Sequence, residues 1–161
     1  MSLEKIVSIL FHPVFVPTIT VFLVVKIYSN IIILENQAGI ILIGTCVFSL
    51  ILPLLSVFIL LLTKKIDSLE MPKKEERFLP ILFASIWMIL GFYFMKEIFS
   101  YAPIMKSIYL GAIYVMLIAL LITKKWKISL HMLAIGGASG VFIMLEFLFG
   151  QNLMLLLITI L

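Results

Sequence analysis

The sequence predicts an all-α protein, a polytopic bundle of transmembrane helices. Of its 161 residues, 64% are hydrophobic and only 12% are charged, about half the charged share of an ordinary soluble domain. The mean hydropathy is +1.30, and the apolar residues gather in runs near the length of about 20 that a spanning helix needs. Such runs are too long and too uniformly apolar for barrel strands, so helices must satisfy the backbone in hydrocarbon. A water-soluble globule is excluded.

The apolar runs predict five complete helices and the beginning of a sixth, within a single integral membrane domain. The complete helices are expected at residues 7–34, 38–63, 80–99, 107–123 and 129–149. A turn follows at residues 150–152, and residues 153–161 are purely apolar. This last run is too short to cross a bilayer. We therefore expect the sixth helix to be incomplete and the native chain to continue past Leu161.

Basic residues gather in two loops with two helices between them, which puts both loops on one face of the bundle. The positive-inside rule predicts that this face is cytoplasmic and that the N-terminus lies with it. The rule loses its basis if these cations bind a substrate instead. The basic residues are Lys64, Lys65, Lys73, Lys74 and Arg77 in the first loop and Lys124, Lys125 and Lys127 in the second.

The first candidate site lies in residues 73–80, Lys-Lys-Glu-Glu-Arg-Phe-Leu-Pro. Pro80 suits the first turn of a helix, because its missing N–H is not needed there. Arg77 would then stand just before a helix N-terminus, where free amides and the helix dipole attract an anion. With Lys73 or Lys74 beside it, its guanidinium could hold a phosphate. The alternative is a solvated loop whose cations obey the positive-inside rule and pair with the two glutamates.

The second candidate site is Lys127-Ile128-Ser129-Leu130-His131, at the start of the fifth expected helix. Ser129 is predicted to be the N-cap, with its hydroxyl accepting from an early amide. His131 then falls in the first turn, where a histidine can give or take a proton near neutral pH. Lys127 adds a cation. The alternative is that Ser129 only caps the helix and His131 is an interfacial residue hydrogen-bonded to the bundle.

Together the two segments bring helix N-termini, cations, a serine and a histidine to one membrane face, which suits a phosphate ester whose apolar part lies among the helices. Here the chain resembles the PAP2 (type-2 phosphatidic acid phosphatase) superfamily, and most closely its small bacterial members. The segment from Lys73 or Lys74 through Arg77 to Pro80 looks like the first motif of that family. Residues 127–131 look like its Ser-x-His motif.

The resemblance implies a metal-independent membrane phosphatase for a lipid phosphate or pyrophosphate. Its implied catalytic residue is His131, which would protonate the leaving-group oxygen. Its implied phosphate-binding residues are Lys73, Lys74, Arg77, Lys127 and Ser129. The resemblance also implies a location in the bacterial inner membrane.

The chain departs from the family pattern in three respects. The spacing in the first motif is tighter than usual, and the second motif has Lys-Ile-Ser-Leu-His in place of Pro-Ser-Gly-His. The third motif, which in the family supplies an arginine and the nucleophilic histidine, is absent, and His12 lies in the wrong element to replace it. The topology would put the missing motif directly after Leu161. Without an activated nucleophile, the chain as printed should not turn over by the covalent route of the family.

The sequence also bears on function classes other than the phosphatase. A non-catalytic membrane subunit, whose basic loops bind anionic lipid or a partner protein, is the main alternative. A small transporter would carry paired broken helices in two similar halves, and the sequence has no internal repeat. The net charge of +4 comes without a long basic tract, so no nucleic-acid partner is expected. Nor does the sequence contain a metal-ligand cluster or a nucleotide fingerprint, so no metal and no cofactor are predicted. The expected partners are membrane lipids and the lipid phosphate substrate. The sequence is also compatible with a homo-oligomer.

Three further features are assigned structural roles. His12 with Pro13 is expected to form a kinked helix start, and Gly136-x-x-x-Gly140 to allow close helix packing. Glu146 lies about 22 Å along the helix from His131 at 1.5 Å per residue. It is therefore expected near the opposite interface, away from the phosphate.

Overall fold

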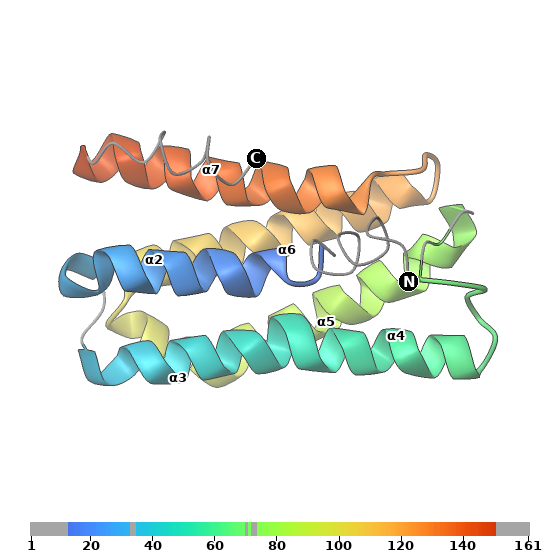
Figure 1. Ribbon diagram of the computed structural model, residues 1–161, viewed down its shortest axis with the longest axis horizontal. Helices are drawn as coiled ribbons and strands as arrows, with labels where there is room; N and C mark the ends of the chain where they lie inside the picture. Colours follow the sequence, from blue (N-terminus) through green and yellow to red (C-terminus); the bar gives the residue numbers. More distant parts are fainter. Residues whose placement is uncertain (1–12, 33–34, 70, 72–73, 151–161) are drawn as a thin grey trace, which may run out of the picture.

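The computed structural model describes residues 13–32, 35–69, 71 and 74–150, and every regular element in this part of the chain is a helix. The helical rods run roughly along the long axis of the molecule, and one of them consists of three elements in succession (Figure 1). The elements are α2 (Val16–Ile32), α3 (Glu35–Thr45), the π-helix η1 (Cys46–Ile51), α4 (Leu52–Leu62), α5 (Lys74–Ser100), α6 (Pro103–Thr123) and α7 (Leu130–Phe149). For these residues the predicted all-α architecture is confirmed.

Within the described residues, four helices are long and apolar enough to cross a membrane. They are Gln37–Leu62, which runs through α3, η1 and α4, then Glu75–Ser100, Pro103–Thr123 and Leu130–Phe149. Helix α2 adds a shorter apolar stretch, Val16–Tyr28. Residues 7–12 and 33–34 of the first expected helix lie outside the described residues, as does the whole of the incomplete sixth helix at 153–161.

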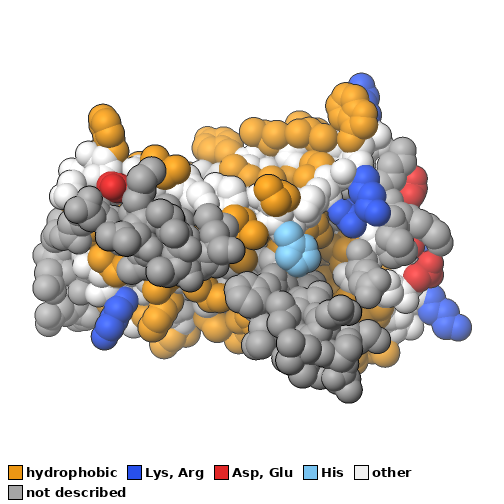
Figure 2. All heavy atoms as spheres, turned by 45° about the horizontal axis from the view of Figure 1, so that its top comes forward, with side chains coloured by type: hydrophobic (Ala, Val, Ile, Leu, Met, Phe, Trp, Pro, Cys, Tyr) orange, Lys and Arg blue, Asp and Glu red, His pale blue; other side chains and the backbone are white. Residues whose placement is uncertain are grey.

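The outer surface of the bundle is strongly apolar. Hydrophobic side chains cover much of the described surface on the face drawn in Figure 2, and Ile43, Leu121 and Phe147 are 68%, 66% and 91% exposed. Soluble monomers rarely expose contiguous apolar surface on such a scale. The surface therefore agrees with the hydropathy of the four long helices.

A π-helix interrupts the span Gln37–Leu62 just before Pro53. The amide of Leu52 donates to the carbonyl of Val47, five residues back. A proline ring inside a regular α-helix would clash with the carbonyl four residues earlier, here that of Ser49. The wider π turn relieves this conflict, so the span continues into α4 without breaking.

Helix α5 begins at Lys74, earlier than the expected start at residue 80. Pro80 consequently lies inside the helix, and its expected place in the first turn is wrong. Lysine, glutamate and arginine are good helix formers, and Glu75 and Glu76 lie in the first turn, where the helix dipole favours negative charge. These gains extend the helix backwards, although Pro80 has no N–H to give to the carbonyl of Glu76.

Helix α6 also begins earlier than expected, at Pro103 instead of residue 107. Pro103 occupies the first helical position, where its fixed φ suits the helix and its missing N–H costs nothing. The connection from α5 is therefore only Tyr101 and Ala102, which makes α5 and α6 close antiparallel neighbours.

The main core lies where α2, α3, α5, α6 and α7 meet. Large side chains fill it, and the rings of Phe99 and Tyr109 stand 5.2 Å apart between their centroids. Two hydrogen bonds between side chains tie helices together inside the apolar region. Thr18 and Ser49 share one at 2.9 Å, and the Trp87 Nε1–H donates to the hydroxyl of Ser56 at 2.8 Å.

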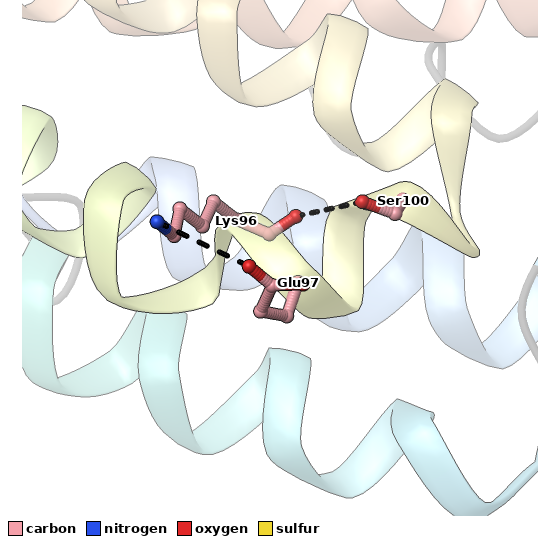
Figure 3. A network of polar contacts seen from close by, with 3 residues as sticks. All are labelled: Lys96, Glu97 and Ser100. Atoms are coloured by element: carbon pink, nitrogen blue, oxygen red, sulfur yellow. Dashed lines mark hydrogen bonds and ion pairs between the residues drawn. The ribbon is translucent and has the colours of Figure 1, made fainter.

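The chain direction gives the bundle two distinct ends. Helices α4 and α6 finish at one end, where α5 and α7 begin, and we call it the basic end (residues 63–69, 71, 74–78 and 123–131; right-hand side of Figure 1). The opposite end carries the α5–α6 connection. There Lys96 and Glu97 pair at 4.0 Å and the Ser100 hydroxyl donates to the Lys96 carbonyl at 3.2 Å (Figure 3). Both charged side chains are more than half exposed, so this pair adds little stability.

Candidate functional site

The start of α7 has the geometry that the sequence predicts for it. Ser129 is the N-cap, with extended backbone, and its Oγ accepts from the amide of Met132 at 3.3 Å. His131 is the second residue of α7, and its side chain is exposed at the basic end. The predicted cap is confirmed, and so is the position of His131 in the first turn. An anion here would meet the positive end of the helix dipole.

Arg77 connects the two candidate segments. It is the fourth residue of α5 and is half-buried. Its Nε–H donates to the carbonyl of Met71 at 3.0 Å, and its Nη1 donates to the carbonyl of Ile128, directly before Ser129. Arg77 therefore stands inside a helix and not before one, but the structure does bring it to the Lys127–His131 segment. These two bonds use two of the five N–H donors of the guanidinium.

Lys124 is a basic residue at this end that the sequence analysis did not assign to the site. Its Nζ lies 5.6 Å from the centroid of the ring of Phe78, the residue that follows Arg77. A cation over an aromatic face is held electrostatically. In the sequence, Phe78 is an aromatic residue beside the arginine and Lys124 is a lysine at the end of an apolar run. Their contact can be inferred only when α5 and α6 are known to be neighbours. Lys127 is exposed in the same α6–α7 connection.

The side chains of two predicted phosphate ligands lie outside the described part of the structure. Lys73 lies outside the described residues, and Lys74 is the first residue of α5, but its side chain is not described. Residues 75 and 76 are glutamates, and Glu76 is buried with 8% of its surface exposed. These acids stabilise the start of α5 through its dipole and also reduce the positive potential that an anion would meet.

The loop before α5 is shaped by two non-glycine residues with left-handed backbone. Lys64, with φ of 54°, ends α4. The amide of Lys65 donates to the Leu60 carbonyl at 2.9 Å and that of Lys64 to the Leu61 carbonyl at 3.0 Å, the pattern of a Schellman motif. Met71 is the second, with φ of 47°. Its buried side chain packs with Ile66 and Leu60 in a small core under the loop.

The features assigned structural roles lie elsewhere. Glu146 is in the last turn of α7, where its carbonyl accepts from the Gly150 amide at 2.7 Å, at the end opposite His131. His12 lies outside the described residues. Gly136 and Gly140 are exposed, and a Cβ added at either would meet no atom within 4 Å. Their expected packing partner is therefore not found among the described residues.

The candidate functional side chains that the structure describes lie at the basic end. Figure 2 shows a histidine on the same face as blue side chains, which are Lys or Arg. Among residues 13–32, 35–69, 71 and 74–150, no group of three or more His, Cys, Asp and Glu side chains could hold a metal ion. An apolar hollow lies between α2 and the middle of the span Gln37–Leu62, lined by Thr18, Ile19, Phe22, Leu42, Ile43 and Cys46. Cys46 is 16 residues before Leu62, about 24 Å along the helix from the basic end.

Comparison of the chain with protein-family models, with curated proteins and with solved structures gives no match.

Proposed function

We propose that this chain is an integral membrane protein that binds the phosphate group of a lipid at the basic end and takes part in hydrolysing its ester bond, as PAP2-like phosphatases do. One observation carries the proposal. The only arginine of the sequence is hydrogen-bonded to the carbonyl of Ile128, one residue before the Ser129 cap and three before His131. Cation, helix N-terminus and proton-transfer group thus come from segments far apart in the chain and meet at one end of the bundle.

Each residue has a separate part in the proposed chemistry. Arg77 and Lys127 neutralise the phosphate oxygens, and the early amides of α7 add partial positive charge. His131 gives a proton to the lipid oxygen when its bond to phosphorus breaks. Stabilisation of this kind needs no metal ion. The acyl chains of the lipid would remain in the hydrocarbon beside the bundle. By the same resemblance, we propose the bacterial cytoplasmic membrane as the location.

The attacking nucleophile is not assigned to a residue of the printed sequence. No segment of the 161 residues matches the third motif of the PAP2 family. We therefore propose that these residues provide the binding and proton-donating part of the site.

A second candidate function is favoured by one observation, namely that Arg77 is already bonded to two backbone carbonyls. Arg77 would then be a structural connection between loops. The protein would be a non-catalytic subunit whose lysines attract anionic lipid.

The deciding experiment uses the protein from its natural source, reconstituted in nanodiscs that contain phosphatidic acid. We expect release of inorganic phosphate, and we expect His131→Ala to abolish release while binding to phosphatidic acid stays nearly intact. Lys106→Ala, which removes an exposed cation near the opposite end, is the matched control and should change neither. Binding without release in the unaltered protein would favour the non-catalytic subunit. Equal binding to phosphatidic acid and phosphatidylcholine would contradict both functions.

A further inference from the structure

We propose that Met71 is a positioning residue that sets the direction of the Arg77 guanidinium through its own backbone carbonyl. The functional half of this inference rests on the proposed phosphate site, whereas the structural half stands on the geometry of the loop. Neither motif of the sequence analysis includes Met71.

Three observations fix the Met71 carbonyl in space. The side chain of Met71 is 3% exposed and packs with Leu60 and Ile66, which anchors the loop to the end of α4. The φ of Met71 is 47°, a left-handed conformation that side chains other than glycine rarely adopt. The carbonyl then accepts from the Nε–H of Arg77 at 3.0 Å. Strain of this type persists only where the surrounding contacts over-determine it.

The carbonyl of Ile128 is the second acceptor for the Arg77 guanidinium. Arg77 Nη1 donates to Ile128, so Met71 and Ile128 together define the plane of the planar guanidinium group. The Nη2 donors then have a defined direction before any ligand arrives. A fixed donor strengthens phosphate binding because less side-chain freedom is lost on binding.

Two variants separate the backbone of Met71 from its side chain. Met71→Val keeps an apolar side chain, but a β-branched residue strongly disfavours positive φ, so the carbonyl should move. Met71→Leu keeps both the anchor and an unbranched Cβ. Met105→Val is the matched control, because Met105 is a fully buried methionine in the first turn of α6, at the end of the bundle away from Arg77. Should Met71→Val fail to fold, Met71→Gly replaces it, since glycine removes the anchor and tolerates positive φ.

The first readout is independent of any phosphate chemistry. Because the chain has a single arginine, selective ¹⁵N-arginine labelling gives one Nε–H signal in an NMR spectrum. We expect slow hydrogen exchange of this Nε–H in the parent, in Met71→Leu and in Met105→Val, and faster exchange in Met71→Val or Met71→Gly. Unchanged exchange in the altered loop would overturn the positioning role, whatever the protein binds.

The second readout tests the functional half in nanodiscs containing phosphatidic acid. We expect Met71→Val to weaken phosphatidic acid binding by about tenfold, the scale of one hydrogen bond to a charged group. In an Arg77→Lys background the same change should have no further effect, because the positioned guanidinium is gone. Equal losses in both backgrounds would contradict the inference. A parent that does not bind phosphatidic acid would refute the proposed function and the functional half with it, and leave the NMR result to decide the structural half.

Discussion

The guanidinium of Arg77 donates to the carbonyl of Ile128, a residue that lies 51 positions further along the chain. This bond joins the start of α5 to the loop before α7. The contact between Lys124 and Phe78 joins the end of α6 to the start of α5 as well. Three chain segments are therefore tied together at the basic end. The contacts that organise the candidate site are thus also contacts that hold the bundle closed there.

Removing the Arg77 side chain should destabilise the fold as well as the site. Arg77→Ala leaves the carbonyls of Met71 and Ile128 without their donor. We expect the free energy of unfolding in detergent to fall by about 2 kcal/mol, because hydrogen bonds to charged groups contribute about 1.5–3 kcal/mol. Arg77→Lys should recover only part of the loss, since an ammonium cannot reach both carbonyls as a planar fork does. Chemical denaturation monitors the change. An unaltered midpoint for Arg77→Ala would mean that the two hydrogen bonds do not form.

The two roles assigned to Ser129 can be separated by a pair of substitutions. Ser129→Ala removes the cap and should cost about 1 kcal/mol of stability. Ser129→Asp keeps the cap and suits the helix dipole, but its negative charge should repel a lipid phosphate and lower binding to phosphatidic acid. The measurements are thermal unfolding and nanodisc binding. Ser107→Ala, which removes an exposed hydroxyl bonded to the Pro103 carbonyl, is the control and should change both little. Tight phosphate binding by Ser129→Asp would contradict a phosphate site next to this residue.

Gly91 is expected to be required by packing, and Gly111 is not. A Cβ added at Gly91 would lie 2.6 Å from the hydroxyl of Tyr109 and 2.7 Å from the Cβ of Phe48. Gly91→Ala should therefore destabilise the bundle by about 1–3 kcal/mol, the usual cost of overpacking. Gly111 has no atom within 4 Å of the same position, so Gly111→Ala should raise stability by up to about 1 kcal/mol through helix propensity. Unfolding of both variants under identical conditions checks the contrast. Equal shifts of the two would show that α5, α6 and η1 are not so closely packed.

The hydrogen bond between Thr18 and Ser49 should couple α2 to η1 weakly. A double-mutant cycle with Thr18→Val and Ser49→Ala is expected to give about 0.6 kcal/mol, the average for such bonds between membrane helices. Thr20→Val replaces Thr18→Val in the control cycle, because the Thr20 hydroxyl donates to the Val16 carbonyl of its own helix at 2.8 Å. The control pair should be additive. Additivity in the first cycle would argue against the contact.

The two ends of the bundle should label from opposite sides of a membrane. In a Cys46→Ser background, Lys125→Cys stands at the basic end and Lys106→Cys near the opposite end, and both positions are exposed. An impermeant maleimide should modify one of them from outside sealed cells and the other only in inverted vesicles. The positive-inside rule predicts that position 125 is the cytoplasmic one. Modification of both from the same side would contradict the spanning arrangement of α6.

Part of the candidate site was predictable because its signals are local. A serine at the start of an apolar run, two residues before a histidine, predicts an N-cap. The prediction is local because the capping hydrogen bond joins groups only three residues apart, and Ser129 has that geometry. The start of α5 was not predicted, because Pro80 suits a first turn equally well and only the sum of neighbouring propensities and dipole effects decides the boundary. Met71 gave no local signal. Lys124 and Phe78 are far apart in the sequence, so their contact could not be predicted before α5 and α6 were known to be neighbours.

By itself, the sequence determined that the protein is a bundle of long apolar helices. Composition and the length of the apolar runs decide this through their interaction with the surrounding solvent, so no knowledge of side-chain contacts is needed. It also determined that two basic loops lie at the same end, since alternating helices leave no other order. Only the tertiary structure decided that Arg77 faces the carbonyls of Met71 and Ile128 and that Lys124 lies over Phe78. Such contacts depend on the rotation and depth of each helix against its neighbours, and side-chain packing across the whole bundle sets both.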